Sequence, residues 1–241
     1  MKIALIGYGK MGKTIERIAL SRGHEIVLAI GHENIDAFTT EAIQQADVAI
    51  EFTQPEAALQ NVSKCLKAGV PVVCGTTGWN EAVPQAEALC AAYKTAMIQS
   101  SNFSLGVNIF FAVNKYLAKL MDKQEAYNVL VEETHHLQKL DAPSGTAITI
   151  AEQIIAQLSR KDKWVKEAEG EHTELAIKAY REPEVPGTHV VTYHSDIDDI
   201  EIKHTAHTRD GFALGAVLAA EFLKGREGVY SMQDVLFPEN A

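Results

Sequence analysis

Short apolar runs alternate with segments of helical periodicity over residues 1–103. Apolar runs that end at turn-forming residues predict buried strands, and the longer periodic segments predict helices. The predicted strands are residues 2–6, 26–30, 48–52, 70–74 and 96–98, and the predicted helices are residues 14–20, 41–45, 55–67 and 82–93. Strands that alternate with helices form parallel βαβ units. This part of the chain therefore predicts an α/β fold with a Rossmann-type parallel sheet.

The pattern changes after residue 103. The elements predicted there are helices at residues 104–121, 146–158 and 212–223 and strands at residues 126–136, 188–194 and 199–208. The last two strands alternate polar and apolar residues, which indicates half-buried antiparallel strands. Residues 160–174 are rich in charge and predict a connector or an exposed loop. We expect a second, α+β domain at residues 104–212 and a first domain that combines residues 1–103 with residues 213–241.

The core of the second domain can be read from one of these helices. Apolar residues recur at helical spacing along residues 146–158, which predicts a buried stripe. The stripe consists of Ala147, Ile150, Ile154 and Leu158. The final helix, at residues 212–223, is rich in Ala, Gly and Leu, and we expect it to pack against the first domain.

A glycine-rich turn follows the first predicted strand and opens the first predicted helix. It reads Gly7-Tyr8-Gly9-Lys10-Met11-Gly12, a GxGxxG pattern inside a βαβ unit. In this setting Gly7 permits a tight turn, Gly9 lets the backbone approach a pyrophosphate, and Gly12 lets the helix lie close to the strand. A merely tight turn is the alternative. We interpret the pattern as a dinucleotide-binding site.

The end of the second predicted strand leaves the choice of dinucleotide open. An acidic residue commonly stands there to bind the adenosine ribose of NAD, but this chain has Gly31-His32, and Glu33 comes late. His32 is able to accept a 2′-phosphate instead, so we expect NADH or NADPH. The carboxyl ends of parallel strands lie at one edge of a sheet. The loops at residues 53–54, 75–77 and 100–103 should therefore lie at the same edge as the glycine turn.

The densest group of chemically useful residues lies between residues 132 and 147. It reads Glu-Glu-Thr-His-His-Leu-Gln-Lys-Leu-Asp-Ala-Pro-Ser-Gly-Thr-Ala. Ser144 is suited to cap a helix whose first N–H groups, with the Thr146 hydroxyl and the bare backbone of Gly145, form a carboxylate-binding site. Lys139 adds positive charge, and a histidine is able to donate a proton near neutral pH.

Two other interpretations of these residues stay open at this point. The Pro-Ser-Gly-Thr sequence is also a common helix start, and the adjacent His135 and His136 point to opposite faces if they lie on a strand. A metal site would use Glu132 or Glu133 with a histidine. No cysteine pattern or HExxH spacing supplies the further ligands that a metal needs, so we predict none.

The composition and charge limit the classes of protein to which the chain can belong. The chain has 241 residues, 46% of them hydrophobic and 22% charged, as in ordinary globular domains. The net charge of −10 argues against a nucleic-acid partner and against an anionic membrane surface. Cys65, Cys74 and Cys90 lie in apolar surroundings, which predicts buried, reduced thiols. Met1 runs directly into the first strand and no apolar run approaches the length of a membrane span, so we expect a cytoplasmic protein.

Taken together, the motifs resemble those of the 4-hydroxy-tetrahydrodipicolinate reductase (dihydrodipicolinate reductase) family of lysine and diaminopimelate biosynthesis. The matching segments are the glycine turn, Glu51-Phe52-Thr53-Gln54-Pro55-Glu56, Gly75-Thr76-Thr77-Gly78, Ser101-Asn102-Phe103-Ser104, Glu133-Thr134-His135-His136, and Lys139 with Asp141-Ala142-Pro143-Ser144-Gly145-Thr146-Ala147. The resemblance covers nearly the whole chain, and its last block is highly specific. It implies a Rossmann domain, a second domain for substrate binding and oligomerisation, and a homotetramer.

The resemblance also implies roles for individual residues. His135 and Lys139 would be the catalytic proton donors in the NADH- or NADPH-dependent reduction of a cyclic imine with two carboxylates. Substrate binding is implied for His136, Ser144, Gly145 and Thr146. Cofactor binding is implied for Gly7, Tyr8, Gly9, Lys10, Met11, Gly12, His32, Thr53, Gly75, Thr76, Thr77, Ser100, Ser101, Asn102 and Phe103. Closure of the two domains about a hinge near residues 103 and 209–213 is expected.

Other classes of function make different predictions. Another Rossmann oxidoreductase would turn over an open-chain keto or aldehyde substrate. A dinucleotide sensor would bind the cofactor without turnover, which leaves the grouped His135, His136 and Lys139 without a purpose. A metal-dependent hydrolase would be inactivated by a chelator.

Overall fold

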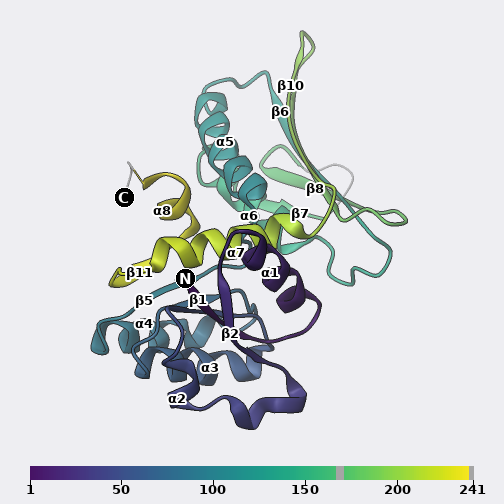
Figure 1. The fold of residues 1–241 in the computed structure, drawn as a ribbon. Coiled ribbons are helices and arrows are strands. Elements are labelled where there is room, and N and C mark those ends of the chain that lie inside the picture. Colours follow the sequence, from purple (N-terminus) through teal and green to yellow (C-terminus); the bar gives the residue numbers. More distant parts are fainter. Residues whose placement is uncertain (167–170, 239–241) are drawn as a thin grey trace. The chain divides into compact units, whose positions relative to one another are not determined.

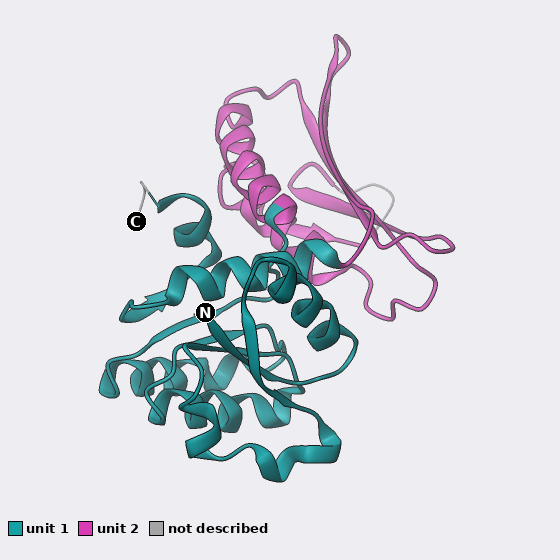
Figure 2. Cartoon of the chain, viewed as in Figure 1, with its two compact units in different colours: residues 1–105, 210–241 teal, residues 106–209 magenta. Residues whose placement is uncertain are grey.

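The structure, a computed structural model, describes residues 1–166 and 171–238 of the chain. The chain divides into two compact units (Figure 2). Unit 1 consists of residues 1–105 and 210–241, of which the last three lie outside the described residues, and unit 2 consists of residues 106–209. The divisions predicted from the sequence lie at residues 103/104 and 212/213. Each unit has its own sheet and its own hydrophobic core.

Unit 1 contains a six-stranded parallel sheet in the order β11-β5-β4-β3-β1-β2 (Figure 1). Its strands are β1 (Lys2–Ile6), β2 (Glu25–Ile30), β3 (Val48–Glu51), β4 (Val72–Cys74), β5 (Ala96–Gln99) and β11 (Gly228–Tyr230). Strands β1 to β5 confirm the predictions from apolar runs, and the parallel sheet confirms the Rossmann-type fold. Strand β11 was not predicted, because three residues are too few to show a pattern.

Helices cover both faces of this sheet. They are α1 (Lys10–Ser21), α2 (Thr40–Ile43), α3 (Pro55–Lys67), α4 (Val83–Ala92), α7 (Asp210–Leu223) and α8 (Met232–Leu236), with the 3-10 helices η1 (His32–Ala37) and η2 (Asn80–Ala82). One core packs α1, α7 and α8 against Ile3 and Leu5, and the other packs α2, α3 and α4 against Ala4 and Ile6. Alternate residues of β1 enter opposite cores, which is why residues 3–6 are all apolar.

The glycine turn permits close backbone contacts at the carboxyl end of β1. Gly7 has a φ of +103°, and a Cβ there would lie 1.9 Å from the carbonyl oxygen of Phe52. A Cβ at Gly12 would lie 2.2 Å from the carbonyl oxygen of Gly7. At Gly9, by contrast, a Cβ would meet no atom of the described residues within 4 Å. Packing therefore requires Gly7 and Gly12, whereas the backbone at Gly9 is open to a ligand.

Unit 2 contains a five-stranded mixed sheet in the order β10-β9-β6-β8-β7. Its strands are β6 (Asn128–His135), β7 (Lys163–Val165), β8 (Glu174–Arg181), β9 (Gly187–His194) and β10 (Asp199–Ala206). Strand β6 pairs parallel with β8 and antiparallel with β9, which in turn pairs antiparallel with β10. The antiparallel β9 and β10 confirm the strands predicted from period-two alternation.

Helices α5 (Leu105–Met121) and α6 (Gly145–Ile155) pack against the sheet of unit 2. The predicted stripe of residues 147, 150, 154 and 158 lies entirely in this core. Val129 and Val131 contribute to the core from β6. The next residues on the same face of β6 are Glu133 and His135, which are also buried. The strand therefore changes from apolar to ionisable along one inward face.

Two strands of unit 2 depart from the sequence analysis. Strand β7 lies inside residues 160–174, so the predicted connector is wrong at residues 163–165, and residues 167–170 of that stretch lie outside the described residues. Strand β8 was missed. It buries Leu175, Ala176 and Ile177 in succession and then ends in polar residues, so neither an alternating nor a long apolar pattern marks it.

Two further expectations can be compared with the described residues. The cysteines Cys65, Cys74 and Cys90 are all free and buried, as predicted. Among the helices in the described residues, none has both the length and the apolar character needed to cross a bilayer.

A close helix–loop contact in unit 1 gives a stability prediction. A Cβ at Gly215 of α7 would lie 1.7 Å from the carbonyl oxygen of Phe103. We expect Gly215→Ala to lower the free energy of unfolding by about 3 kcal/mol, measured by urea denaturation, because the backbone must shift. Gly211→Ala in the same helix is the control, since its Cβ would lie 3.5 Å from the Ser104 hydroxyl, an ordinary contact. Equal effects of the two substitutions would contradict the packing argument.

Candidate active site

The carboxyl end of β6 carries ionisable residues on the face that packs against α6. Glu133 and His135 are two residues apart, so they share a face of the strand. Strand β9 places His189 opposite Glu133, and strand β8 places Arg181 opposite His135. Directly paired residues of neighbouring strands lie on one face of a sheet. The register of the sheet therefore brings four ionisable side chains together.

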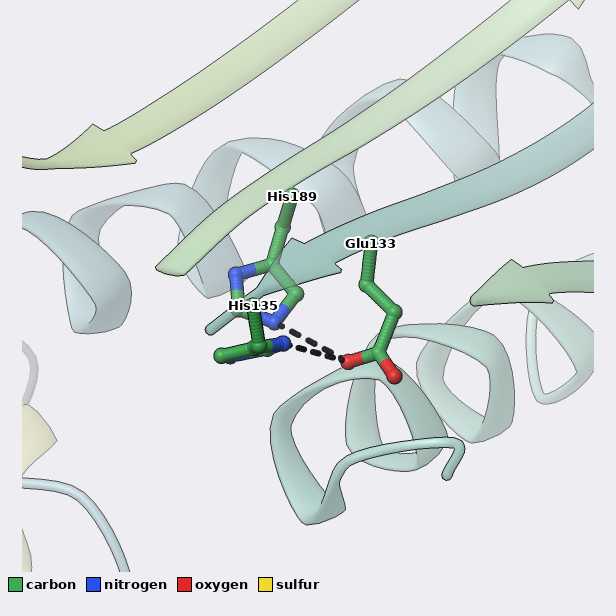
Figure 3. Close-up of side chains that lie close together, drawn as sticks. All are labelled: Glu133, His135 and His189. Carbon is green, nitrogen blue, oxygen red and sulfur yellow. Dashed lines mark ion pairs between the residues drawn. The ribbon is translucent and has the colours of Figure 1, made fainter. Parts of the chain in front are cut away.

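Glu133 is the centre of this group, and its two carboxylate oxygens have different partners. Oε1 accepts a hydrogen bond from the backbone N–H of Ser144 at 2.9 Å and lies 3.4 Å from the guanidinium of Arg181. Oε2 lies 3.1 Å from Nδ1 of His135 and 3.8 Å from Nε2 of His189 (Figure 3). The contact with His135 has the distance of an ion pair but not the alignment of a hydrogen bond.

Burial and charge set the protonation of this group. Burial raises the pKa of Glu133, but the adjacent His135 and Ser144 outweigh burial and lower that pKa to about 2. Burial, and then the neighbouring His135, lower the pKa of His189 to about 3. Near neutral pH, Glu133 is therefore an anion and His189 is a neutral imidazole. The rings of His135 and His189 meet edge to face, with their centroids 5.1 Å apart. Because His189 is neutral, His135 is the remaining candidate for proton exchange.

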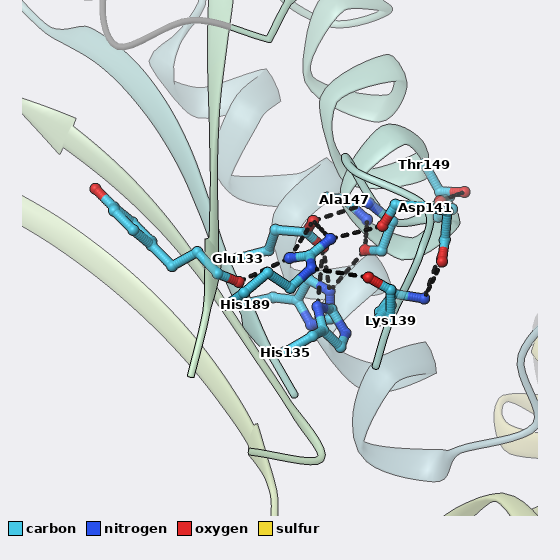
Figure 4. A network of polar contacts seen from close by, with 11 residues as sticks. Glu133, His135, Lys139, Asp141, Ala147, Thr149 and His189 are labelled. Carbon is cyan, nitrogen blue, oxygen red and sulfur yellow. Dashed lines mark hydrogen bonds and ion pairs between the residues drawn. The ribbon is translucent and has the colours of Figure 1, made fainter. Parts of the chain in front are cut away.

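Arg181 connects this group to the loop that carries Lys139. Figure 4 shows Glu133, His135, Lys139 and Asp141 within this network of polar contacts. Its Nη2 donates a hydrogen bond to the carbonyl of Asp141 at 2.6 Å, and its Nε donates to the carbonyl of Lys139 at 3.3 Å. The Nζ of Lys139 in turn lies 2.9 Å from the carboxylate of Asp141. Because one guanidinium bonds to the loop backbone and also pairs with Glu133, the loop is held close to that carboxylate.

The start of α6 has the capping geometry that its sequence predicts. The Ser144 hydroxyl accepts a hydrogen bond from the N–H of Ala147 at 3.2 Å, which confirms Ser144 as the N-cap. Ser144 is buried, and its hydroxyl also lies 3.3 Å from Nε2 of His189. Gly145, by contrast, is exposed, and a Cβ there would meet no atom of the described residues within 4 Å. Of these two predicted substrate residues, Gly145 is open to a ligand and Ser144 supports the helix start from within.

His136 and Gly187 complete the surroundings of His135. His136 follows the last residue of β6 and is half-buried, whereas His135 is buried. A Cβ at Gly187 would lie 3.1 Å from Nε2 of His135. Because Nδ1 of His135 faces Glu133, Nε2 is the nitrogen left for a ligand. Gly187 is the residue whose missing side chain gives that nitrogen room.

Glu133, His135 and His189 also have the geometry of a possible metal site. Their potential ligand atoms all lie within 4.8 Å of one another. A site of Glu133 with a histidine was one interpretation of the sequence, but it did not include His189. The guanidinium of Arg181 lies beside the same carboxylate, and a positive group there disfavours a cation. The arrangement therefore suits acid–base chemistry better than metal binding.

Unit 1 holds a cavity of about 360 Å³ at the carboxyl ends of β1, β2 and β3. Strands β2 and β3 lie on opposite sides of β1, and such a reversal of strand order is where open α/β sheets bind ligands. Predicted cofactor residues that line the cavity are Gly7, Tyr8, Gly9, His32 and Thr53. A larger hollow, of about 580 Å³, contains Met1, Lys2 and Asp47 and none of the predicted site residues.

The other predicted cofactor residues lie at the same edge of the sheet. Lys10 and Met11 begin α1, while residues 75–77 follow β4 and residues 100–103 follow β5. The Phe103 ring packs 5.8 Å from the ring of Phe52, which follows β3. The parallel sheet thus brings these loops to one edge, as the sequence analysis expected.

Three residues of the site were missed from the sequence. Arg181, His189 and Gly187 are distant from residues 132–147 in the chain, and only the pairing of β6 with β8 and β9 brings them near. One signal was available, because Glu133 lies on the inward face of a predicted strand. A buried carboxylate requires a partner, so that position implied a cation or several donors elsewhere in the domain.

Comparison with known protein families gives two matches that together span most of the chain. A family described as dihydrodipicolinate reductase, N-terminus, matches residues 1–103. A second, described as dihydrodipicolinate reductase, C-terminus, matches residues 106–236.

Individual relatives agree with these matches. A 4-hydroxy-tetrahydrodipicolinate reductase of Christiangramia forsetii is 52% identical over 238 residues, covering 98% of each chain. A reductase of the same name from Neisseria gonorrhoeae is 36% identical over 232 residues, covering 92% of this chain and 83% of that protein. Among solved structures, a dipicolinate-bound dihydrodipicolinate reductase from Paenisporosarcina sp. TG-14 has a TM-score of 0.78 at 22% identity, covering 97% of this chain and 98% of that one. The last likeness bears on the fold alone.

The low pKa of His189 gives a prediction for stability against pH. An unfolded chain takes up a proton at His189 below about pH 6.5, whereas the folded chain does so only near its pKa of about 3. The free energy of unfolding should therefore fall as the pH drops from 7 to 5, by up to about 1.4 kcal/mol per pH unit from this one group. Glu133 does not contribute to this slope, because its stabilisation is present above about pH 4.5 and is lost only as the pH falls towards its pKa of about 2.

Urea denaturation of His189→Gln at pH 5, 6 and 7 measures this contribution. The variant should show a shallower pH dependence than the wild type. His172→Gln, which removes an exposed histidine of the same unit, is the control and should keep the wild-type slope. A wild-type slope in His189→Gln would contradict the assignment.

Proposed function

The chain belongs to the dihydrodipicolinate reductase family, and from this premise we propose that it reduces 4-hydroxy-tetrahydrodipicolinate to tetrahydrodipicolinate in lysine and diaminopimelate synthesis. Relatives at 52% and 36% identity carry this reductase name. One observation in the structure supports the proposal above the others. The buried Glu133 carboxylate contacts His135, pairs with the arginine that holds the Lys139 loop, and bonds to the start of α6.

The cofactor is NADH or NADPH, which supplies a hydride to the substrate ring when it is bound. Unit 1 fits a dinucleotide, because the backbone at Gly9 is open and lies next to the N-terminus of α1, where N–H groups favour a pyrophosphate. The cavity beside the glycine turn offers space for the nucleotide. His32 lines this cavity where an acidic residue would bind the adenosine ribose of NAD. Because the carboxylate is absent from this position, it does not favour one of the two cofactors over the other.

The substrate loses its 4-hydroxyl group as water, and in this proposal His135 donates the proton that the ring takes up after hydride addition. Its Nδ1 faces Glu133, whose negative charge stabilises the protonated ring. Nε2, next to Gly187, then carries the proton that is transferred. His189 remains neutral near pH 7, so it does not compete for this proton.

Lys139 is the second proton donor, and its charge offsets the negative charge that develops on the ring. The substrate carboxylates bind at His136 and at the start of α6, through Gly145 and Thr146. The first turn of a helix offers N–H groups without intrahelical partners, and its positive end favours an anion. Ser144 acts here as the N-cap that orders this turn.

The proposal extends to assembly and location. We infer a homotetramer formed through unit 2, and a cytoplasmic enzyme, both on the strength of the family resemblance. The net charge of −10 disfavours a nucleic-acid partner.

Coupled turnover with freshly synthesised substrate tests the function. We expect oxidation of NADH or NADPH that depends on the cyclic imine and that a chelator does not inhibit. Turnover of an open-chain keto acid or aldehyde in place of the cyclic imine would identify a different Rossmann oxidoreductase. Binding of the nucleotide without any turnover would identify a sensor.

Substitutions at the proposed proton donors test their roles. His135→Gln and Lys139→Ala should each lower kcat by about two to four orders of magnitude, the usual range for lost acid–base groups. His172→Gln is the control, because this exposed histidine lies outside the site. Wild-type turnover in both variants would refute the assigned roles.

Gly145→Ala separates ligand binding from folding at the start of α6. The added methyl group meets no atom of the described protein within 4 Å, so the thermal midpoint of unfolding should not fall. We expect the KM for the dicarboxylate substrate to rise by about tenfold or more, with a smaller change in kcat. The reason is that the added methyl group blocks the substrate carboxylate from the N–H groups at the start of α6. A fall in kcat at unchanged KM would argue against a carboxylate site there.

A further inference from the structure

Unit 1 contains a second buried carboxylate, Glu51, to which the proposed mechanism assigns no role. Glu51 is the last residue of β3 and is fully buried. Its Oε1 accepts hydrogen bonds from the hydroxyl of Thr53 and from Nδ2 of Asn61, the latter at 3.3 Å. Its Oε2 accepts from the hydroxyl of Thr76 at 2.7 Å and from the thiol of Cys74 at 3.1 Å. All four donors are neutral, and they come from β4, α3 and the loops after β3 and β4.

The donors also bond to one another. The Thr76 hydroxyl, which donates to Glu51, accepts a hydrogen bond from the backbone N–H of Thr53 at 2.8 Å. The Thr53 hydroxyl, which also donates to Glu51, lies 3.2 Å from the Nδ2 group of Asn61. The loops after β3 and β4 are therefore joined through a pair of threonine hydroxyls beside one carboxylate.

A carboxylate is the one side chain that fixes the direction of all these bonds. It only accepts, so each hydroxyl must turn its hydrogen towards Glu51 and its lone pairs towards Thr53 N–H or Asn61. Burial, and then the charge of Glu51, raise the pKa of the Cys74 thiol, which keeps that thiol protonated as a donor. A glutamine at position 51 would place an NH2 group, which is a donor, where Glu51 has one of its two acceptor oxygens. One hydroxyl would then face a second donor and lose its own acceptor.

This network forms part of the wall of the proposed cofactor cavity. Thr53 and Asn61 line the cavity together with the glycine turn. Neither residue is held in place by the apolar cores alone, since both side chains bond to Glu51 or to its partners. The charge that orders this wall is itself out of reach of a ligand, because Glu51 has no exposed surface.

We propose that Glu51 is a positioning residue for the cofactor, which fixes the loops after β3 and β4 through the hydroxyl groups of Thr53 and Thr76. This inference rests on the proposed function in so far as the ligand of the cavity is NADH or NADPH. Glu51 touches neither the cofactor nor the reacting atoms. It acts by ordering the groups that do, so that the loops are arranged before the cofactor binds.

Isothermal titration of the full-length protein with NADH and with NADPH tests the proposal. Glu51→Gln should raise the Kd of the better-bound nucleotide by about tenfold or more while leaving the number of binding sites per chain unchanged. Its KM for the dicarboxylate substrate at saturating cofactor should stay within about twofold of the wild-type value, because the substrate residues belong to unit 2. Glu221→Gln is the matched control, since it removes a carboxylate of the same unit that pairs with Arg22 and His24 outside the cavity.

The separate readouts distinguish positioning from a general loss of structure. Partial unfolding lowers the number of binding sites and leaves the Kd of the remaining sites unchanged. A Kd in Glu51→Gln within twofold of the wild type would overturn the proposal, and a lowered number of binding sites leaves the decision to a second pair of variants. A wild type that binds neither nucleotide would instead overturn the proposed function.

A second pair of variants decides the matter if Glu51→Gln does not fold. Thr76→Val has the same shape as threonine but lacks the hydroxyl that joins Glu51 to the Thr53 N–H, whereas Thr76→Ser keeps it. We expect the Kd for the nucleotide to rise by about tenfold in Thr76→Val and to stay within about threefold of wild type in Thr76→Ser. Equal affinities of the two variants would refute the role of this network.

Discussion

A carboxylate inside a protein must be compensated by hydrogen bonds or opposite charge, and at Glu133 this constraint organises unit 2. Leaving such a group unpaired costs several kcal/mol. The partners that meet the requirement come from four places: the start of α6, the last residue of β8, the inward face of β9, and His135 on β6 itself. Satisfying one buried anion therefore assembles an acid–base residue, a helix start and a cation-bearing loop in one region. The site is ordered by the fold rather than by a ligand.

The two units use the same device with different partners. In each, a strand with an apolar inward face carries a buried carboxylate at or near its carboxyl end, Glu51 as the last residue of β3 and Glu133 two residues before the end of β6. At Glu51 the donors are neutral hydroxyl, amide and thiol groups, so the charge is spread over a network that remains fixed. At Glu133 the partners include Arg181 and two imidazoles, so the charge is coupled to a group able to exchange a proton. The first arrangement suits the support of a binding wall, and the second suits chemistry.

Much of the fold could be predicted from the sequence because local pattern determines it. Buried parallel strands are apolar over most of their length, so β1 to β5 and the edge at which their loops meet followed from short apolar runs and one glycine pattern. Strand β8 was not predicted because its buried residues are consecutive rather than alternating. His135, Lys139 and the Ser144 cap were predicted because they lie in one stretch, residues 132–147, with recognisable turn chemistry. The structure confirms the Ser144 cap, while the roles of His135 and Lys139 stay predictions. Arg181, His189 and Gly187 could not be found in this way, since their nearness to His135 depends on strand register, which no local segment encodes.

The division of the chain has a consequence for how the protein forms on the ribosome. Unit 2 is continuous in the chain, whereas unit 1 is built from two segments separated by the whole of unit 2. Helix α7, which packs against Ile3, Leu5, Ile50 and Ile98, belongs to the later segment. Until it has been synthesised, the face of the nascent sheet that α1 and α7 share is only partly covered, and its apolar residues are exposed to aggregation. Domains tend to fold as units during translation, so unit 2, although second in sequence order, is the first that can be completed.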